Sequence, residues 1–237
     1  MIPERFHPPR QARSRETLDR ILDAVEEVME EKSFTDATLA EIMDRAGVTI
    51  GAFYRRFEDK DSLLHLLDER FWNEMHDFAA EQLDPGRWKG KSIRQILEEW
   101  IPVHVALYRS RRGLIRSLFL RSRTDTVIRE TASRVNSYFL RRIRVLLLAR
   151  RDEIHHPDPE YAIDLALLAL VGTLREVVVF GEVWPNARRV GGPRLPMEMT
   201  RLLERYLGVE ESVAPRAGRA RRSRALVPVR AAMRKRG

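Results

Sequence analysis

Apolar residues recur every three or four positions along most of this chain, which is the spacing of an amphipathic helix. Residues 14–32 predict a first helix on this basis. Its apolar stripe consists of Leu18, Ile21, Leu22, Val25 and Met29. Its acidic residues are expected to face solvent, among them Glu26, Glu27, Glu30 and Glu31. No stretch shows the strict alternation of apolar and polar residues that is typical of a strand, so the pattern predicts an all-α fold.

The later elements follow from the same periodicity. Asp59 is predicted to cap a long helix that runs to about residue 82, and a Pro/Gly-rich linker is expected over residues 84–91. Pro102 is expected to break or kink the next helix. The predicted helices beyond the linker cover residues 92–110, 113–123, 125–151, 160–181 and 197–208, with loops over 154–159 and 184–196. The helix over 160–181 is apolar on nearly all sides and should be buried on several of them.

Residues 38–60 carry the most specific local signals. Thr38 followed by Glu41 is a capping box that begins one helix, and Gly47 is suited to end it. Thr49 can cap a second helix, in which Phe53 and Phe57 lie four residues apart on one face. Two short helices joined by a tight glycine-containing turn predict a helix-turn-helix.

The second of these helices has an outer face suited to close approach. Because Phe53 and Phe57 point inward, Gly51 and Arg55 should point outward. Hydrogen-bond donors lie around this small surface, namely Tyr54, Arg55, Arg56 and Lys60. A thin helix fringed by donors suits the major groove of double-stranded DNA.

The stretch AGVTIGAFYRRFEDKDSLL resembles the recognition-helix region of TetR-type bacterial transcriptional regulators, and the match covers residues 14–67. Ile50 and Arg56 depart from the residues that are common in the family. The resemblance implies an N-terminal three-helix DNA-binding domain and a C-terminal helical domain that binds a ligand and dimerises. It also implies that the last two helices pair with their copies in a four-helix bundle, whereas an ordinary monomer core is the alternative.

The expected organisation has four parts: a basic arm over 1–13, the helix-turn-helix domain over 14–67, a regulatory domain over 68–211 and a disordered tail over 212–237. The net charge of +8 belongs to the tail. Nine of the 43 Lys and Arg residues lie in residues 215–237, which contain no acid, so the remainder holds 34 basic and 35 acidic residues. DNA binding must therefore depend on local placement of charge. The arm and the tail could each contact DNA or remain solvated.

Individual DNA contacts can be assigned as expectations. Tyr54, Lys60, Thr38 and Thr49 are expected at phosphates, with Arg56 beside them. Arg55 could read guanine, because its fork matches O6 and N7, or bind phosphate. Ala52 and Ile50 could meet thymine methyl groups, although Ile50 could equally pack inward. Gly51 allows the close approach.

The C-terminal part offers aromatic and polar residues at helical spacing. By resemblance, some of them line an effector pocket, and core packing is the alternative for each. These candidates are Trp100, His104, Tyr108, Phe119, Tyr138, Arg175, Glu176 and Phe180. Trp100, His104 and Tyr108 could share one face. Arg175 and Glu176 need partners inside their apolar helix, and such a partner could be a residue across a dimer, a ligand or a residue of the same chain.

Other classes of function find little support. The chain has no cysteine, no signal peptide is visible, and the most apolar run, 161–180, contains three charged residues, so we expect a cytoplasmic protein without a membrane span. No catalytic motif or cofactor site is present, and the histidines at 155 and 156 fit no recognised metal site.

We expect a homodimeric, ligand-responsive regulator, most simply a repressor at a palindromic operator. The alternatives are an activator, a constitutive repressor, or a helical enzyme with a vestigial helix-turn-helix.

Overall fold

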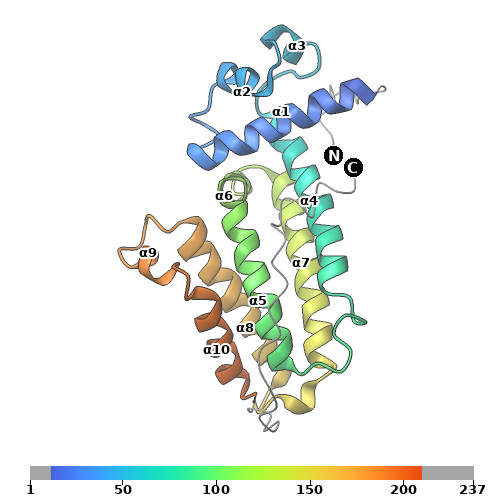
Figure 1. The fold of residues 1–237 in the computed structure, drawn as a ribbon, viewed down its shortest axis with the longest axis vertical. Helices are drawn as coiled ribbons and strands as arrows, with labels where there is room; N and C mark the ends of the chain where they lie inside the picture. Colours follow the sequence, from blue (N-terminus) through green and yellow to red (C-terminus); the bar gives the residue numbers. More distant parts are fainter. Residues whose placement is uncertain (1–11, 210–237) are drawn as a thin grey trace, which may run out of the picture. The chain divides into compact units, whose positions relative to one another are not determined.

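The computed structural model describes residues 12–209, and within this range it contains helices and turns but no β-strand (Figure 1). The all-α prediction is confirmed. The chain divides into two compact units. The first unit contains residues 12–76 and 111–137 of the described range, and the second contains residues 77–110 and 138–209. The predicted arm lies almost entirely outside the described residues, and the predicted tail lies wholly outside them.

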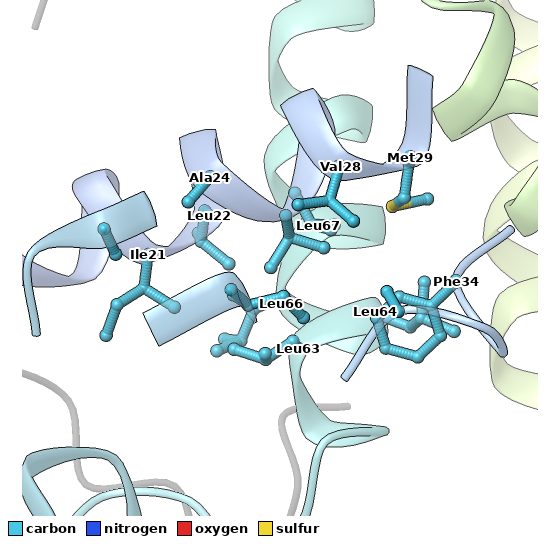
Figure 2. Packing of buried hydrophobic residues seen from close by; sticks show 14 of the residues in the cluster. Ile21, Leu22, Ala24, Val28, Met29, Phe34, Leu63, Leu64, Leu66 and Leu67 are labelled. Atoms are coloured by element: carbon cyan, nitrogen blue, oxygen red, sulfur yellow. The ribbon is translucent and has the colours of Figure 1, made fainter. Parts of the chain in front are cut away.

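The first unit is built on a small helical core. Its helices are α1 (Ala12–Glu31), α2 (Leu39–Ala46), α3 (Ile50–Tyr54), α6 (Arg112–Arg121) and the first parts of α4 (Ser62–Gln82) and α7 (Thr126–Leu148). Figure 2 shows apolar side chains of α1, such as Ile21 and Val28, packed close to Leu63 and Leu67 of α4. Phe34 lies in the same cluster. The apolar stripe predicted for the first helix is therefore the stripe that forms this core.

Helix α6 packs against α1 in the first unit through an unusually close approach. A Cβ atom added at Gly113 would lie 2.0 Å from the carbonyl oxygen of Met29. The Gly113 amide also donates to Glu30 Oε1 at 3.0 Å. Only glycine fits at this position. The compact unit around the helix-turn-helix thus includes residues 111–137, which lie far from residues 14–67 in sequence.

The second unit contains the remaining helices. They are α5 (Ile93–Ser110), the 3-10 helix η1 (Arg151–Glu153), α8 (Pro159–Leu174), the π-helix η2 (Arg175–Val179), α9 (Ala187–Val190), α10 (Leu195–Leu207) and the ends of α4 and α7. Helix α10 packs against both α5 and α8, and η2 packs against α5. Pro102 lies inside α5, which runs through it, so the expected break is absent.

Two predicted loops hold more structure than their composition indicated. The linker over 84–91 forms successive turns around Trp88, whose side chain is fully buried. Its indole Nε1 donates to the Gln82 carbonyl at 2.8 Å. The predicted loop over 184–196 contains α9 and the start of α10. Pro and Gly indicated a change of direction but not that an aromatic side chain would anchor it.

Helix α8 buries one side and leaves the other side uncovered in the single chain. Ala162, Ala166 and Leu170 are buried, whereas Tyr161, Leu165 and Leu168 are exposed. The expectation of burial on several sides therefore fails for one face within this chain. Among the described residues, no helix combines the length and apolar character that a bilayer crossing requires.

Candidate nucleic-acid interface and ligand site

The helix-turn-helix has the predicted capping geometry. The Glu41 amide donates to Thr38 Oγ1 at 3.2 Å, and the Thr38 amide donates to Glu41 Oε2 at 2.8 Å, which completes the capping box. Gly47 ends α2 with φ of +64°, in the left-handed region that favours glycine. Hydrogen bonds from Lys32 and Thr38 lower the pKa of Glu41 to about 2. The capping box and Gly47 therefore fix where α2 begins and ends.

Helix α3 is short and anchored from one side. Thr49 caps it by accepting a hydrogen bond from the Ala52 amide at 3.2 Å. Phe53 and Phe57 are buried, with ring centroids 4.8 Å apart. Since these two rings face the core, the opposite face of α3 is turned outward.

The outward face of α3 carries the residues expected to meet DNA. Gly51 and Arg55 are exposed, Tyr54 is 59% exposed, and Ile50 is 45% exposed, so the outward alternative holds for Ile50. A Cβ atom added at Gly51 would meet nothing within 4 Å. The fold of the chain therefore does not require glycine at this position.

Lys60 is placed differently from the other predicted phosphate contacts. Its Nζ donates to the carbonyls of Phe34 at 2.9 Å and Ala37 at 2.8 Å, with Thr35 at 3.4 Å. The ammonium also lies 4.7 Å from the centroid of the Phe34 ring. These contacts hold the turn before α2, and a phosphate contact by Lys60 stays a prediction. Arg56 is half-buried.

A buried cluster of charges joins α1, α4 and the start of α6, and the sequence did not indicate it. Glu26 is only 4% exposed, so its predicted solvent-facing position is wrong. It pairs with Arg70 of α4 and with Arg111. Arg111 also pairs with Glu74, and Arg70 pairs with Asp23. Periodicity missed Glu26 because it follows Val25 directly at the edge of the apolar stripe.

Three of the predicted ligand residues form a row along α5 in the second unit. The rings of Trp100 and His104 are stacked with centroids 4.8 Å apart, and those of His104 and Tyr108 are 5.3 Å apart. Phe139 of α7 lies 5.6 Å from the His104 ring. The predicted shared face is confirmed, whereas a ligand there stays a prediction.

The other predicted ligand residues are not all part of this row. Arg175 pairs with Glu176 at 3.1 Å, which is the intramolecular alternative, and Trp184 Nε1 donates to Glu176 at 3.3 Å. Tyr138 accepts a hydrogen bond from Arg142 at 3.3 Å. Phe180 ends η2. Phe119 belongs to the first unit, whereas the other seven predicted ligand residues belong to the second.

The histidines of the loop before α8 have backbone partners. His155 Nδ1 lies 2.8 Å from the Gly208 carbonyl, and His156 Nδ1 lies 2.9 Å from that of Asp158. Within residues 12–209, no cluster of three or more His, Cys, Asp or Glu side chains could hold a metal ion. The histidines therefore help to fix the loop.

Comparison with known proteins points to the same domain as the geometry. The model of the tetR family of bacterial regulatory proteins matches residues 21–67. Over 94 residues the chain is 31% identical to the HTH-type transcriptional regulator TtgR of Pseudomonas putida. It is 32% identical over 94 residues to the probable HTH-type transcriptional regulator ArpR, also of Pseudomonas putida. Each alignment covers 37% of this chain and 44% of the relative, less than half its length.

Solved structures share the fold over most of the chain. The MbdR regulator from Azoarcus sp. CIB aligns with a TM-score of 0.60 at 18% identity, over 82% of this chain and 99% of that one. FadR from Bacillus subtilis, in complex with stearoyl-CoA, aligns with a TM-score of 0.57 at 20% identity, over 81% and 99%. The matched family and curated relatives are transcriptional regulators rather than enzymes. The similarity to the tetR family of bacterial regulatory proteins therefore lies in residues 21–67, the part of the chain that holds the helix-turn-helix.

Proposed function

We propose that the protein is a homodimeric, effector-responsive transcriptional repressor that acts in the cytoplasm on a palindromic operator. The observation that carries this proposal is the outward face of α3. Gly51 leaves that face thin, and the exposed side chains of Ile50, Tyr54 and Arg55 surround it. A surface of this kind can enter a major groove, where Arg55 meets a base or a phosphate. Thr38, Thr49, Ala52, Arg56 and Lys60 complete the proposed contacts.

The proposed dimer uses the uncovered apolar faces of α8 and α10. Leu165 and Leu168 are exposed on α8, and Met197 and Leu202 are exposed on α10. The two helices pack against each other within the second unit. A Cβ at Gly172 would meet nothing within 4 Å, which leaves room for a partner helix. Burying both faces against their copies removes this apolar surface from water.

The proposed response to an effector follows the course of the chain. Helix α5 ends at Ser110, and Arg111 and Gly113 then anchor the start of α6 to α1. A ligand beside α5 that shifts its end would therefore pull on the unit that carries α3. Since operator and effector favour different arrangements, each weakens the binding of the other by the same factor.

The DNA proposal is tested by selecting bound fragments from genomic DNA with the full-length protein. Affinity for the selected fragment is then measured for Gly51→Ala and Arg55→Ala. We expect each variant to bind at least tenfold more weakly, because one fills the close approach and the other removes a charged contact. The matched control is Arg129→Ala, which removes an exposed arginine from α7 of the same unit.

The folded state should tolerate these changes. Gly51→Ala should melt no lower than the wild type, because its Cβ has free space and alanine favours helices. Unchanged affinity in both α3 variants, or an equal loss in Arg129→Ala, contradicts the proposal. A reporter assay with and without the gene then separates a repressor from an activator.

The dimer is tested by sedimentation of Leu168→Glu. Leu168 is 65% exposed, so a carboxylate there leaves the protomer fold intact but opposes burial between two copies. We expect a monomer that binds the selected fragment poorly. The control is Val183→Glu, at a similarly exposed residue outside α8 and α10. A Leu168→Glu protein that sediments as the wild type contradicts the proposed interface.

A further inference from the structure

Two adjacent aromatic side chains in the second unit hold buried polar atoms that nothing in the described chain satisfies. Trp100 is 3% exposed and His104 is 6% exposed. Trp100 Nε1 and both ring nitrogens of His104 are buried without a hydrogen-bond partner among residues 12–209. Leaving such a group unpaired costs the free energy of its lost hydrogen bonds to water. Three unpaired nitrogens within one stacked pair therefore need an explanation.

The same unit does satisfy a comparable side chain elsewhere. Trp88 is as deeply buried as Trp100, yet its indole donates to the Gln82 carbonyl at 2.8 Å. Arg150 likewise donates to the carbonyls of Trp88 and Lys91. The helical scaffold is thus able to pair its buried donors. Arg142 Nε and Glu204 Oε1 of this unit are also buried without a hydrogen bond, but the Arg142 guanidinium donates to Tyr138 and Ala80, and Glu204 pairs with Arg94 at 3.6 Å. Trp100 and His104 differ because no polar side-chain atom of either residue has a hydrogen-bond partner in the described chain.

The chemistry of these atoms defines what would complete them. An indole N–H only donates, and a neutral imidazole donates at one nitrogen and accepts at the other. Burial lowers the pKa of His104 to about 4, so its ring is neutral near pH 7. A complementary ligand must therefore be able to both accept and donate, and needs no charge. A carboxamide or lactam, whose C=O accepts and whose N–H donates, meets this requirement.

The surroundings favour an aromatic body for this ligand. The rings of His104, Trp100, Tyr108 and Phe139 lie at centroid distances typical of aromatic packing, from 4.8 to 5.6 Å. The nearby π-helix η2 packs against α5, and its Arg175 is paired with Glu176. An anionic ligand would have to compete for that arginine. Tyr108 is half-buried next to exposed residues 109 and 110, so it lies at the solvent-facing end of this row of rings.

We infer that Trp100 and His104 form the polar floor of a binding site for an uncharged aromatic ligand that carries a carboxamide-like donor and acceptor. This inference rests on the proposed function, because such a ligand would be the effector. Tyr108 and Phe139 provide aromatic walls. The ligand supplies the hydrogen bonds that the chain leaves unmade.

The inference is tested by calorimetric titration of the full-length protein with three matched compounds. 2-Naphthamide has the aromatic body and the amide, decahydro-2-naphthamide lacks the aromatic rings, and 2-naphthoate replaces the amide by an anion. We expect 2-naphthamide to bind at least tenfold more tightly than either relative. Equal binding of the three, or no binding of 2-naphthamide, overturns the inference. A site filled by water alone predicts the latter result.

Variants locate the site and keep the test independent of DNA binding. Trp100→Phe and His104→Phe retain the rings but remove the polar atoms, so each should weaken 2-naphthamide binding at least tenfold while the thermal melt stays cooperative. The control Trp184→Phe changes an exposed indole and should bind as the wild type. Unchanged binding in both α5 variants overturns the site. A protein that binds genomic fragments but not 2-naphthamide disproves this inference alone, and the reverse result disproves the DNA proposal alone.

Discussion

The two compact units treat buried polar groups in opposite ways. In the first unit, Glu26 and Arg111 are both about 5% exposed at the side chain and are paired with each other and with further charges. In the second unit, Trp100 and His104 are equally buried but neutral and unpaired. Each charge of the first arrangement has a partner of opposite charge within the chain, although Arg70 Nε and Arg111 Nε make no hydrogen bond. The side-chain nitrogens of Trp100 and His104 have no hydrogen-bond partner at all among the described residues.

This difference separates a structural role from a binding role. The paired cluster holds α1, α4 and the start of α6 in one arrangement, because moving any one of its side chains would leave a buried charge without its partner. The nitrogens of Trp100 and His104 make no hydrogen bond that could stabilise the fold. Their burial costs free energy until a ligand forms hydrogen bonds with them. Burial alone does not distinguish the two roles, but the hydrogen-bond partners do.

The largest expected effect comes from breaking the paired cluster. Glu26→Gln leaves Arg70 and Arg111 with less compensating charge in a buried site. We expect the free energy of unfolding to fall by about 3 kcal/mol, since removing one partner of a buried ion pair costs roughly 3–5 kcal/mol. Urea unfolding followed by circular dichroism measures this loss.

The neighbouring residue provides the control for Glu26. Glu27 is exposed on the same helix, and Glu27→Gln should change stability by less than about 0.5 kcal/mol. Similar losses for the two variants would show that the cluster does not behave as a buried network.

The elements of the helix-turn-helix were predictable because their signals are local. Thr38, Glu41, Gly47 and Thr49 determine helix ends within a few residues of themselves, and the structure confirms each cap. The outward direction of Gly51 follows from Phe53 and Phe57 in the same way. In these cases both partners of the interaction lie within a few residues of each other in the sequence.

Contacts between distant residues could not be predicted in this way. Glu26 and Arg111 are 85 residues apart, and no periodicity links them. Gly113 reads as a helix start, although its role is to admit the Met29 carbonyl. The row on α5 was predictable as a face, but the absence of partners for its nitrogens depends on every neighbouring element. The lysine at 60 shows the same limit, because its carbonyl acceptors lie 23–26 residues earlier.

The unpaired histidine gives a second, smaller expected effect, through pH. Burial lowers the pKa of His104 from 6.5 to about 4. The unfolded chain therefore binds a proton at this histidine below pH 6.5, whereas the folded chain binds it only below about pH 4. As a result, the free energy of unfolding falls as the pH is lowered from 6.5 to 4. By pH 5 the wild type should lose about 2 kcal/mol from this residue.

His104→Phe should remove that part of the pH dependence. The measurement is the free energy of unfolding in urea at pH 7.5 and pH 5 for both proteins. The control His76→Phe changes an exposed histidine and should keep the wild-type slope. A His104→Phe protein that destabilises on acidification as steeply as the wild type would contradict the buried, neutral state of the imidazole.

The smallest expected effect comes from Asp68, an intermediate case in the first unit. Asp68 is buried on α4, and burial raises its pKa to about 6 despite a hydrogen bond from Thr131 and the charge of Arg134. An acid whose pKa is raised from 3.8 contributes its full stability below pH 3.8 and loses it as the pH rises through about 6.

Asp68→Asn keeps an acceptor for Thr131 but carries no charge. Allowing for partial solvation, we expect it to stabilise the protein by about 1 kcal/mol at pH 7.5 and by almost nothing at pH 4. Urea unfolding at both pH values, with Glu69→Gln as an exposed neighbour on the same helix, measures the difference. A loss of stability at pH 7.5 would show that the Asp68 carboxylate is stabilised by its neighbours, as the charges around Glu26 are. The expected gain would show that its burial costs free energy, as the burial of His104 does.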